Sequence, residues 1–278
     1  MKFGRIIRDN NEEYGVVVNS NWYPISNFSR DTNGIEKFLD LPNLIKGELQ
    51  AVCDINSETI TWLPPIKRPG KIICVGRNYA AHSEEQGKQP ETKPLLFTKY
   101  PTSMIGHMSK IPYPKHTQFL DYEVEIAVIM GKEANKLSEE DNPLDYVFGY
   151  TIANDLTARD VQQNEKQWTF GKGFDNSLPI GPLIITSDEL QNPNDNEIWL
   201  TVNGDKRQLS NTTKMIFDIP FLIRYISQVI TLQPGDIILT GTPEGVGYYM
   251  DPISTLNPGD YVSCGVSGIG ELRFQITE

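Results

Sequence analysis

The stretch at residues 121–130, DYEVEIAVIM, constrains the fold of this chain more than any other segment. Its β-branched residues and its alternation predict a strand, on which every second side chain faces the same side. One side, from Tyr122 to Met130, is wholly apolar, whereas the other begins with Asp121, Glu123 and Glu125 before it turns apolar. The carboxylates therefore lie on a face of the strand that becomes buried further along, where unpaired charges are costly.

Something must offset the charge of these acids. Two carboxylates about 4 Å apart repel each other by about 4 kcal/mol at an effective dielectric of roughly 20. Solvent, protonation, a basic partner or a cation could remove that cost. A hard divalent cation such as Mg2+ is the natural partner of an all-oxygen cluster. The pattern thus indicates a sheet protein with a candidate metal site.

The composition restricts the classes of partner. A chain of 278 residues allows one large domain, with or without a small appendage. With 25 basic and 36 acidic residues it carries a formal charge of −11, so we expect neither nucleic acid nor a membrane as a partner. Its 3 cysteines are scattered, which predicts no disulfide framework and no zinc motif. Because we also expect no signal segment and no membrane span, a cytoplasmic location is predicted.

The chain divides into two predicted domains, at residues 1–65 and 66–278. The first is predicted to be a small α/β domain, with strands at 2–7 and 14–18 and short helices at 34–41 and 44–52. The proline- and glycine-rich segment at 63–70 marks the boundary. The second is predicted to be rich in strands, with helices at 78–86, 157–165 and 218–230, the last of which Asp218 can cap. This excess of strands excludes a Rossmann or TIM layout and predicts an α+β, mainly β fold.

A second acidic element, NDLTARD at residues 154–160, follows the predicted strand at 147–153 and opens a helix. Asp155 therefore stands at the end of a strand, where ligand-binding residues are common. Two interpretations are open. Asp155 could cap the helix and pair with Arg159 four residues later, or it could be a metal ligand.

Two further segments carry residues suited to catalysis. His82 and Glu85 share a face of the predicted helix at 78–86, where a carboxylate would orient an imidazole that acts as a general base. The alternative is a solvated helix face. Lys172 stands between two glycines and could reach a substrate carboxylate or enolate, or simply belong to a surface turn. Thr242, in TGTPEGVG, could present its hydroxyl and nearby backbone N–H groups to an anion.

Taken in order, these segments resemble the fumarylacetoacetate hydrolase superfamily. The resemblance covers residues 70–276, most of the chain, and the residues before about 65 are similar to the variable amino-terminal domain of many members. The matching strings are VGRNY followed by His82 and Glu85, DYEVEIAVIMGK, NDLTARDV, GKGFD with PIGP, VNG, NT with MIF, PGDIILTGTPEGVG and GIG. Gly173 and the segment Tyr248 to Met250 depart from the usual pattern at positions that border the pocket.

The resemblance implies a roll of mixed β-sheets that assembles as a homodimer. It implies that Glu123, Glu125 and Asp155 bind a divalent metal, generally Mg2+ and sometimes Mn2+ or Ca2+. The other residues that match site positions of the family are catalytic His82, Glu85 and Lys172 and substrate-binding Arg77, Arg159, Gln162 and Thr242. Asp121 is expected to support the site rather than to bind the metal.

The activity that follows from the resemblance is metal-dependent hydrolysis of a C–C bond in a small 2-oxo acid or acylpyruvate. The same metal and enolate chemistry also serves isomerisation or tautomerisation of 2-hydroxymuconate-type dienoates and decarboxylation of oxaloacetate. A catalytically silent metal or ligand binder is a more distant alternative. The physiological substrate does not follow from these motifs.

Overall fold

The computed structural model describes residues 1–25, 53–55, 60–190 and 192–278, and within them the fold is mainly β. The two helices predicted at 34–41 and 44–52 lie outside the described residues. The strands are β1 (Lys2–Arg8), β2 (Asn11–Val18), β3 (Asn21–Pro24), β4 (Cys53–Asp54), β5 (Ile60–Trp62), β6 (Ile72–Gly76), β7 (Leu95–Lys99), β8 (Met104–Ile105), β9 (Ser109–Pro112), β10 (Leu120–Asp121), β11 (Val124–Met130), β12 (Val147–Asn154), β13 (Thr157–Ala158), β14 (Leu178–Thr186), β15 (Glu197–Val202), β16 (Asp205–Asn211), β17 (Ile237–Leu239), β18 (Tyr261–Val266) and β19 (Gly270–Thr277). The α-helices are α3 (Ala80–Glu85), α4 (Arg159–Asn164), α5 (Thr169–Lys172) and α6 (Ile219–Ser227). Single 3-10 turns lie at Pro101–Ser103, Pro143–Tyr146, Thr212–Lys214 and Gly247–Tyr249.

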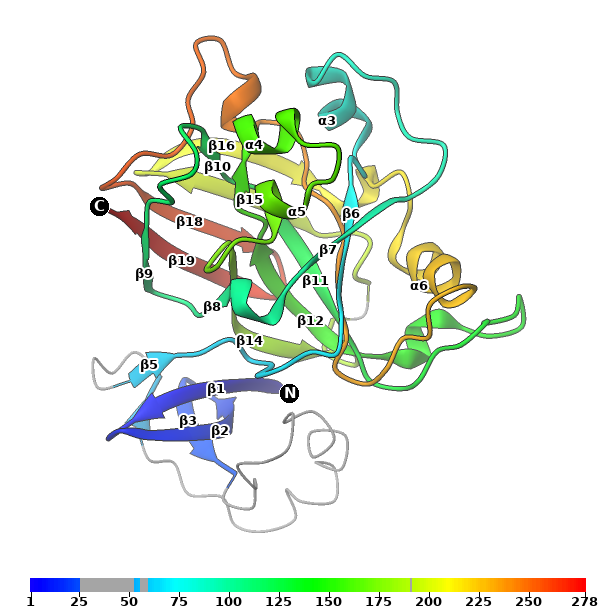
Figure 1. Cartoon of the computed structure of the whole chain (residues 1–278). Helices are drawn as coiled ribbons and strands as arrows, with labels where there is room; N and C mark the ends of the chain where they lie inside the picture. The colour runs from blue at the N-terminus through cyan, green and yellow to red at the C-terminus, as the bar shows by residue number, and fades with distance from the viewer. Residues whose placement is uncertain (26–52, 56–59, 191) are drawn as a thin grey trace.

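The largest sheet runs through the whole molecule in the order β4-β3-β2-β1-β14-β12-β11-β17-β6-β7. The pairs along this order are antiparallel except β17 with β6, and β8, which lies off this order, pairs in parallel with β14. The amino-terminal strands continue this sheet because β1 pairs with β14, with Phe3 opposite Ile184. Figure 1 shows this amino-terminal meander at the lower end of the molecule, whereas α3 and α4 lie at the upper end.

A second sheet, in the order β16-β15-β18-β19-β9, packs against the first. The apolar side of β11, including Val124 and Ile126, lies in the core with residues of β15 and β18 such as Leu200 and Val262. The opposite side of β11, through Ile129, belongs to a separate apolar cluster. The two sides of β11 therefore differ as the alternation predicts, and the mixed sheets agree with the predicted fold class.

The strand predicted over residues 121–130 is interrupted in the structure, because β10 ends at Asp121 and β11 starts at Val124. The backbone N–H groups of Glu123 and Val124 donate hydrogen bonds to side chains and not to a neighbouring strand. The N–H of Glu123 donates to Asn154 Oδ1 at 3.1 Å, and that of Val124 donates to Gln208 Oε1 at 3.1 Å. This break leaves Glu123 outside the ladder but next to Glu125.

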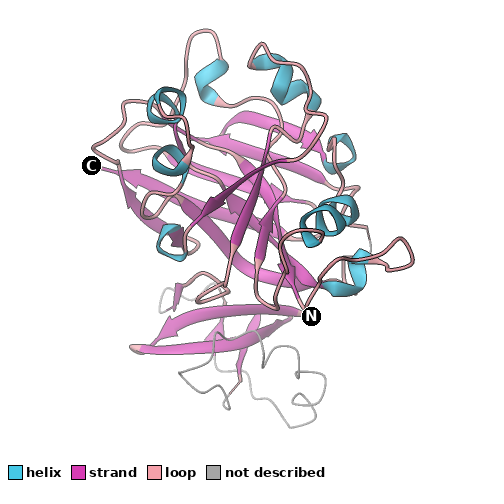
Figure 2. Ribbon diagram, turned by 45° about the vertical axis from the view of Figure 1, so that its right-hand side comes forward, coloured by secondary structure: helices cyan, strands magenta, loops and turns pink. Residues whose placement is uncertain are grey.

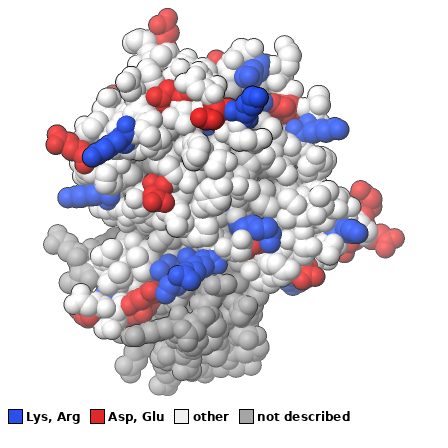
Figure 3. Space-filling view, viewed as in Figure 1, with Lys and Arg blue, Asp and Glu red and all other residues white. Residues whose placement is uncertain are grey.

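The helices are short and gather around the ends of the strands (Figure 2). As the sequence predicts, Asp218 caps α6 by accepting a hydrogen bond from the N–H of Phe221 at 2.8 Å. The helix predicted at 157–165 begins only at Arg159, because Thr157 and Ala158 pair with β10 as β13. None of the described helices combines the length and the apolar character needed to cross a membrane. Acidic and basic side chains are interspersed over the face in Figure 3.

Candidate active site

Three carboxylates meet where β11 begins and β12 ends. Glu123 and Glu125 lie at the start of β11, and Asp155 follows directly after β12. One carboxylate oxygen from each lies within 4.8 Å of the others. All three side chains are buried, with exposed fractions of 5%, 1% and 0%. The antiparallel pairing of the two strands places Val124 opposite Asn154, and this register brings the three acids together.

Two buried lysines contact these acids. Nζ of Lys172, the last residue of α5, lies 2.7 Å from Glu123 Oε2 and 2.7 Å from Asp155 Oδ2. Nζ of Lys99, at the end of β7, lies 2.6 Å from Asp155 Oδ1 and also donates to the backbone carbonyls of Lys172 and Leu156. Asp155 therefore binds two cations and not the start of α4, whose N-cap is Ala158. The interpretations of Asp155 as a helix cap and of Lys172 as part of a surface turn are both wrong.

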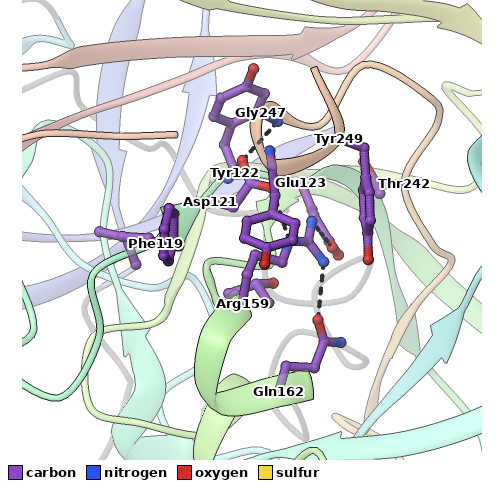
Figure 4. Close-up of polar contacts among 12 residues, drawn as sticks. Phe119, Asp121, Tyr122, Glu123, Arg159, Gln162, Thr242, Gly247 and Tyr249 are labelled. Carbon is purple, nitrogen blue, oxygen red and sulfur yellow. Dashed lines mark hydrogen bonds and ion pairs between the residues drawn. The ribbon is translucent and has the colours of Figure 1, made fainter. Parts of the chain in front are cut away.

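Arg159 completes the set of cations around the acids (Figure 4). Its guanidinium lies 2.6 Å from Glu123 Oε1 and 2.9 Å from Asp121 Oδ2, and its NH1 group donates to Gln162 Oε1 at 3.2 Å. It does not pair with Asp155, because Lys99 and Lys172 hold that carboxylate. Asp121 accepts from the N–H groups of Gly247 and Tyr248 as well, which places it behind Arg159 and outside the three-carboxylate cluster.

The pKa values of the acids differ according to their contacts. Burial alone would raise the pKa of Glu123, but Lys172 and Arg159 outweigh burial and lower it to about 2. Burial, together with repulsion from Asp155 and Glu123, raises the pKa of Glu125 well above its usual range. Glu125 is therefore the carboxylate whose charge is least compensated by the side chains around it.

The residues present fit a divalent metal ion. They supply a buried, all-oxygen donor set, which suits hard cations such as Mg2+ and Mn2+. Counting Asp121, four buried carboxylates face the three cations Lys99, Lys172 and Arg159, so one negative charge is left over. A divalent ion held by Glu123, Glu125 and Asp155 would reverse that imbalance and leave one positive charge for an anionic ligand.

The loop at residues 240–247 supports the site through its backbone. The N–H of Gly241 donates to Glu125 Oε2 at 2.7 Å, and that of Gly245 donates to Glu85 Oε2 at 2.9 Å. Gly241 has a φ of 93°, and a Cβ there would lie 2.8 Å from the Cβ of Asn78. Only glycine satisfies both conditions. The backbone of the loop TGTPEGVG therefore binds the protein's own carboxylates, in addition to any ligand.

His82 and Glu85 form a pair on α3. Nδ1 of His82 lies 2.5 Å from Glu85 Oε1, and the imidazole is only 2% exposed. The interpretation of this helix face as solvated is therefore wrong. Because Glu85 is also fixed by Gly245, the pair is tied to the loop that supports Glu125.

One cavity joins the two groups of residues. It is narrow, with a volume of about 20 Å³. Phe97 and Trp168 contribute apolar surface, and Arg77 at the rim is held by Glu91 at 2.7 Å. Its polar lining comprises Arg77, His82, Gln86, Glu123, Arg159, Gln162, Lys172 and Thr242. The sequence-predicted residues thus converge on one cavity, with Glu125 and Asp155 just behind it.

Thr242 is oriented by a residue that sequence reasoning missed. The amide of the buried Gln208 donates to Thr242 Oγ1 at 2.8 Å and to the carbonyl of Pro243 at 2.8 Å. Since the hydroxyl accepts this hydrogen bond, its own proton is free to be donated into the cavity. Lys99 was missed as well. For Lys99 the available signal was a lysine that ends a strongly apolar strand pattern, LLFTK.

Comparisons with known proteins agree with this geometry. A family model described as fumarylacetoacetate (FAA) hydrolase C-terminal matches residues 71–277. The mitochondrial oxaloacetate tautomerase of Rattus norvegicus is 43% identical over 212 residues, which are 76% of this chain and 67% of that protein. The structure of a fumarylacetoacetate hydrolase from Exiguobacterium antarcticum has a TM-score of 0.84 and 35% identity, covering 100% of this chain and 99% of that one.

A fumarylpyruvate hydrolase from Pseudomonas aeruginosa, solved in complex with Mn2+ and pyruvate, has a TM-score of 0.70 and 31% identity. The match covers 80% of this chain and 93% of that one. The family match spans most of the chain and includes every residue of the site described above. The chain belongs to the fumarylacetoacetate hydrolase family of enzymes.

Proposed function

We propose that the protein is a divalent-metal-dependent tautomerase of small 2-oxo dicarboxylates of the oxaloacetate type. The observation that carries the proposal is that one cavity is lined both by Glu123, from the carboxylate cluster, and by His82, which is paired with Glu85. The identity of 43% with the oxaloacetate tautomerase of the rat favours this reaction within the family.

Glu123, Glu125 and Asp155 would hold the metal, with Mg2+ or Mn2+ as the favoured ions for this donor set. When bound, the metal polarises the 2-oxo group of the substrate as a Lewis acid. Arg159, Arg77 and the hydroxyl of Thr242 line the cavity as donors and bind the substrate carboxylates. Lys172 contacts two acids of the cluster, lines the cavity and stabilises negative charge on the 2-oxygen.

His82 performs the proton transfer. Its Nε2 removes a proton from C3, the electron pair of the C–H bond forms the C2–C3 double bond, and the π pair of the C2=O bond moves onto the 2-oxygen. The imidazolium of His82 then gives its proton to the 2-oxygen, which regenerates the neutral base. All atoms of the substrate are retained, so the product is its enol, and the reverse sequence returns the keto form. Glu85 accepts the Nδ1–H of His82 and stabilises the imidazolium that forms during transfer.

Hydrolysis of a C–C bond is the second candidate. The 35% identity with the fumarylacetoacetate hydrolase of Exiguobacterium antarcticum extends over the whole chain and favours it. In that reaction His82 would take a proton from water, which would attack a carbonyl distant from the metal. Isomerisation of dienoates and decarboxylation of oxaloacetate start from the same enolate chemistry.

A substrate panel in the presence of Mg2+ or Mn2+ tests these functions. Oxaloacetate, an acylpyruvate, fumarylpyruvate and a 2-hydroxymuconate-type dienoate are followed side by side. Glu123→Ala serves as the blank, and Glu165→Gln, an exposed acid at the end of α4, serves as the matched control. We expect metal-dependent enol–keto conversion of oxaloacetate that is lost only in the blank.

The other outcomes are equally informative. Pyruvate release from an acylpyruvate without tautomerisation would move the assignment to a hydrolase. Conversion of the dienoate alone would make it an isomerase, and carbon dioxide release from oxaloacetate a decarboxylase. Metal binding with no turnover of any substrate would identify a silent binder and overturn the proposal.

A further inference from the structure

Gln86, the residue that follows α3, contacts the histidine on the side opposite Glu85. Its side-chain nitrogen Nε2 lies 2.8 Å from Nε2 of His82. Gln86 is half-buried and lines the same cavity as His82. Its backbone N–H donates to the carbonyl of Ser83 at 3.2 Å, which fixes the start of the side chain at the helix end. Sequence reasoning did not single out this residue.

The two contacts of the imidazole determine where its proton lies. A carboxylate only accepts hydrogen bonds, so Nδ1 must carry the proton that is shared with Glu85. An amide nitrogen only donates, so Nε2 of His82 must be unprotonated to accept from Gln86. Both contacts require the same neutral form of His82, with its lone pair on the nitrogen that faces Gln86.

We propose that Gln86 is a positioning residue that holds His82 as the Nδ1–H tautomer and keeps its Nε2 unprotonated. Within the described part of the chain, His82 is the one hydrogen-bond partner of the Gln86 amide, so the second N–H and the carbonyl oxygen are left for a ligand. The lone pair of Nε2 cannot accept from Gln86 and take a substrate proton at the same time. Gln86 therefore releases His82 when the cavity is filled, a step that rests on the proposed proton transfer.

Selective labelling of histidine with 15N tests the tautomer directly. The chain contains 3 histidines, so a long-range 1H–15N spectrum of the Mg2+-loaded protein shows three ring systems. The variant His82→Gln assigns one of them. We expect the Nδ1 of His82 to have the shift of a protonated nitrogen and its Nε2 that of an unprotonated one, near neutral pH and without substrate.

Two variants of Gln86 separate its effect from that of Glu85. Gln86→Glu keeps the length of the side chain but replaces the donor by an acceptor, so we expect both nitrogens of His82 to become protonated. Gln86→Met keeps the length and removes the donor, so we expect a larger share of His82 to carry a proton on Nε2 than in the native protein. Glu84→Gln changes an exposed acid on the same helix and should leave the spectrum unchanged.

An unchanged His82 spectrum in Gln86→Glu would overturn the proposal, as would a protonated Nε2 in the native protein. Thermal unfolding and Mg2+ titration of each variant check that the fold and the metal site are intact. If a substrate is found, Gln86→Glu should lower kcat by about 10²–10⁴-fold, the usual contribution of a general base. Because the spectra need no turnover, failure of the proposed tautomerase would not be confused with failure of this inference.

Discussion

The cavity has two walls that are built in different ways. The acid wall, consisting of Glu123, Glu125 and Asp155, lies at strand ends and is held by buried cations. The base wall, consisting of His82, Glu85 and Gln86, is carried by α3, a helix of 6 residues. A helix this short is not stable on its own, and its position depends on packing and on the contact between Glu85 and Gly245.

The difference corresponds to two tasks of the site, namely holding buried charges and transferring a proton. Buried charges must be held in fixed pairs, because an unpaired one would cost several kcal/mol. A base that exchanges hydrogen bonds with a substrate does not have to be held as rigidly. A short helix at the surface leaves it this freedom to move. The loop at 240–247 connects the walls, since Gly241 binds Glu125 and Gly245 binds Glu85.

The largest effect is expected from the acid wall. Asp155→Asn keeps the shape of a ligand but removes its charge, while Lys99 and Lys172 remain beside it. We expect metal binding to be lost and kcat to fall by at least about 10⁴-fold, since a metal supplies several kcal/mol of stabilisation. Isothermal titration with Mn2+ and kcat measure the two effects. Retained metal affinity with lost activity would contradict Asp155 as a ligand.

The base wall should respond in activity alone. His82→Asn removes the proton acceptor but touches no metal ligand, so we expect kcat to fall by about 10²–10⁴-fold with unchanged metal affinity. His116→Asn, at an exposed histidine, is the matched control. If metal affinity fell together with kcat in His82→Asn, the two walls would not be separable as described here.

Lys99 tests whether the acid wall depends on its buried cations. Lys99→Met removes the contact with Asp155 Oδ1 but keeps the length of the side chain. We expect metal affinity to fall by about 10–100-fold, as for other residues that orient metal ligands. Lys110→Met, at an exposed lysine of β9, is the control. Equal metal affinities in Lys99→Met and the control would show that Asp155 is held without Lys99.

The two walls also differ in how far the sequence predicted them. Alternation in residues 121–130 separated the apolar side of β11 from the acidic side, and Asp218 marked the start of α6. The grouping of Asp155 with Glu123 and Glu125 was predicted only through the family resemblance. The structure shows its physical basis, because β11 and β12 are consecutive strands that pair in register.

Contacts between distant segments could not be predicted in this way. Lys99 lies 56 residues before Asp155, and Gln208 lies 34 residues before Thr242. Neither pair has a spacing that reveals it, and both depend on how whole sheets pack. Gln86 was missed for a different reason, because a glutamine at a helix end is ordinarily solvated and only the orientation of His82 gives it a role.

The pH dependence of metal binding should follow from Glu125. Because the pKa of this carboxyl is raised in the folded, metal-free protein, it still holds a proton at pH values where an unfolded glutamate has lost it. Metal-free stability should therefore fall as pH rises through the raised pKa. Since a metal must displace this proton, affinity should rise by up to about tenfold per pH unit in that window.

Titration with Mg2+ in buffers of different ionisation enthalpy counts the protons released. We expect about one proton per metal ion below the raised pKa and none above it. An affinity that does not change with pH would mean that the carboxylates are already ionised, so that the cations of the acid wall compensate Glu125 as well.

The smallest effect is expected at Thr242, on the loop that joins the walls. Thr242→Val removes the hydroxyl that Gln208 orients toward the cavity but keeps the shape of the side chain. The loss of one hydrogen bond to a charged carboxylate should cost about 1.5 kcal/mol, or about tenfold in KM, with little change in kcat. Thr242→Ser, which keeps the hydroxyl, should restore KM. A fall in kcat at constant KM would instead place Thr242 in the transition state, and the loop would then take part in the chemistry of both walls rather than in their support alone.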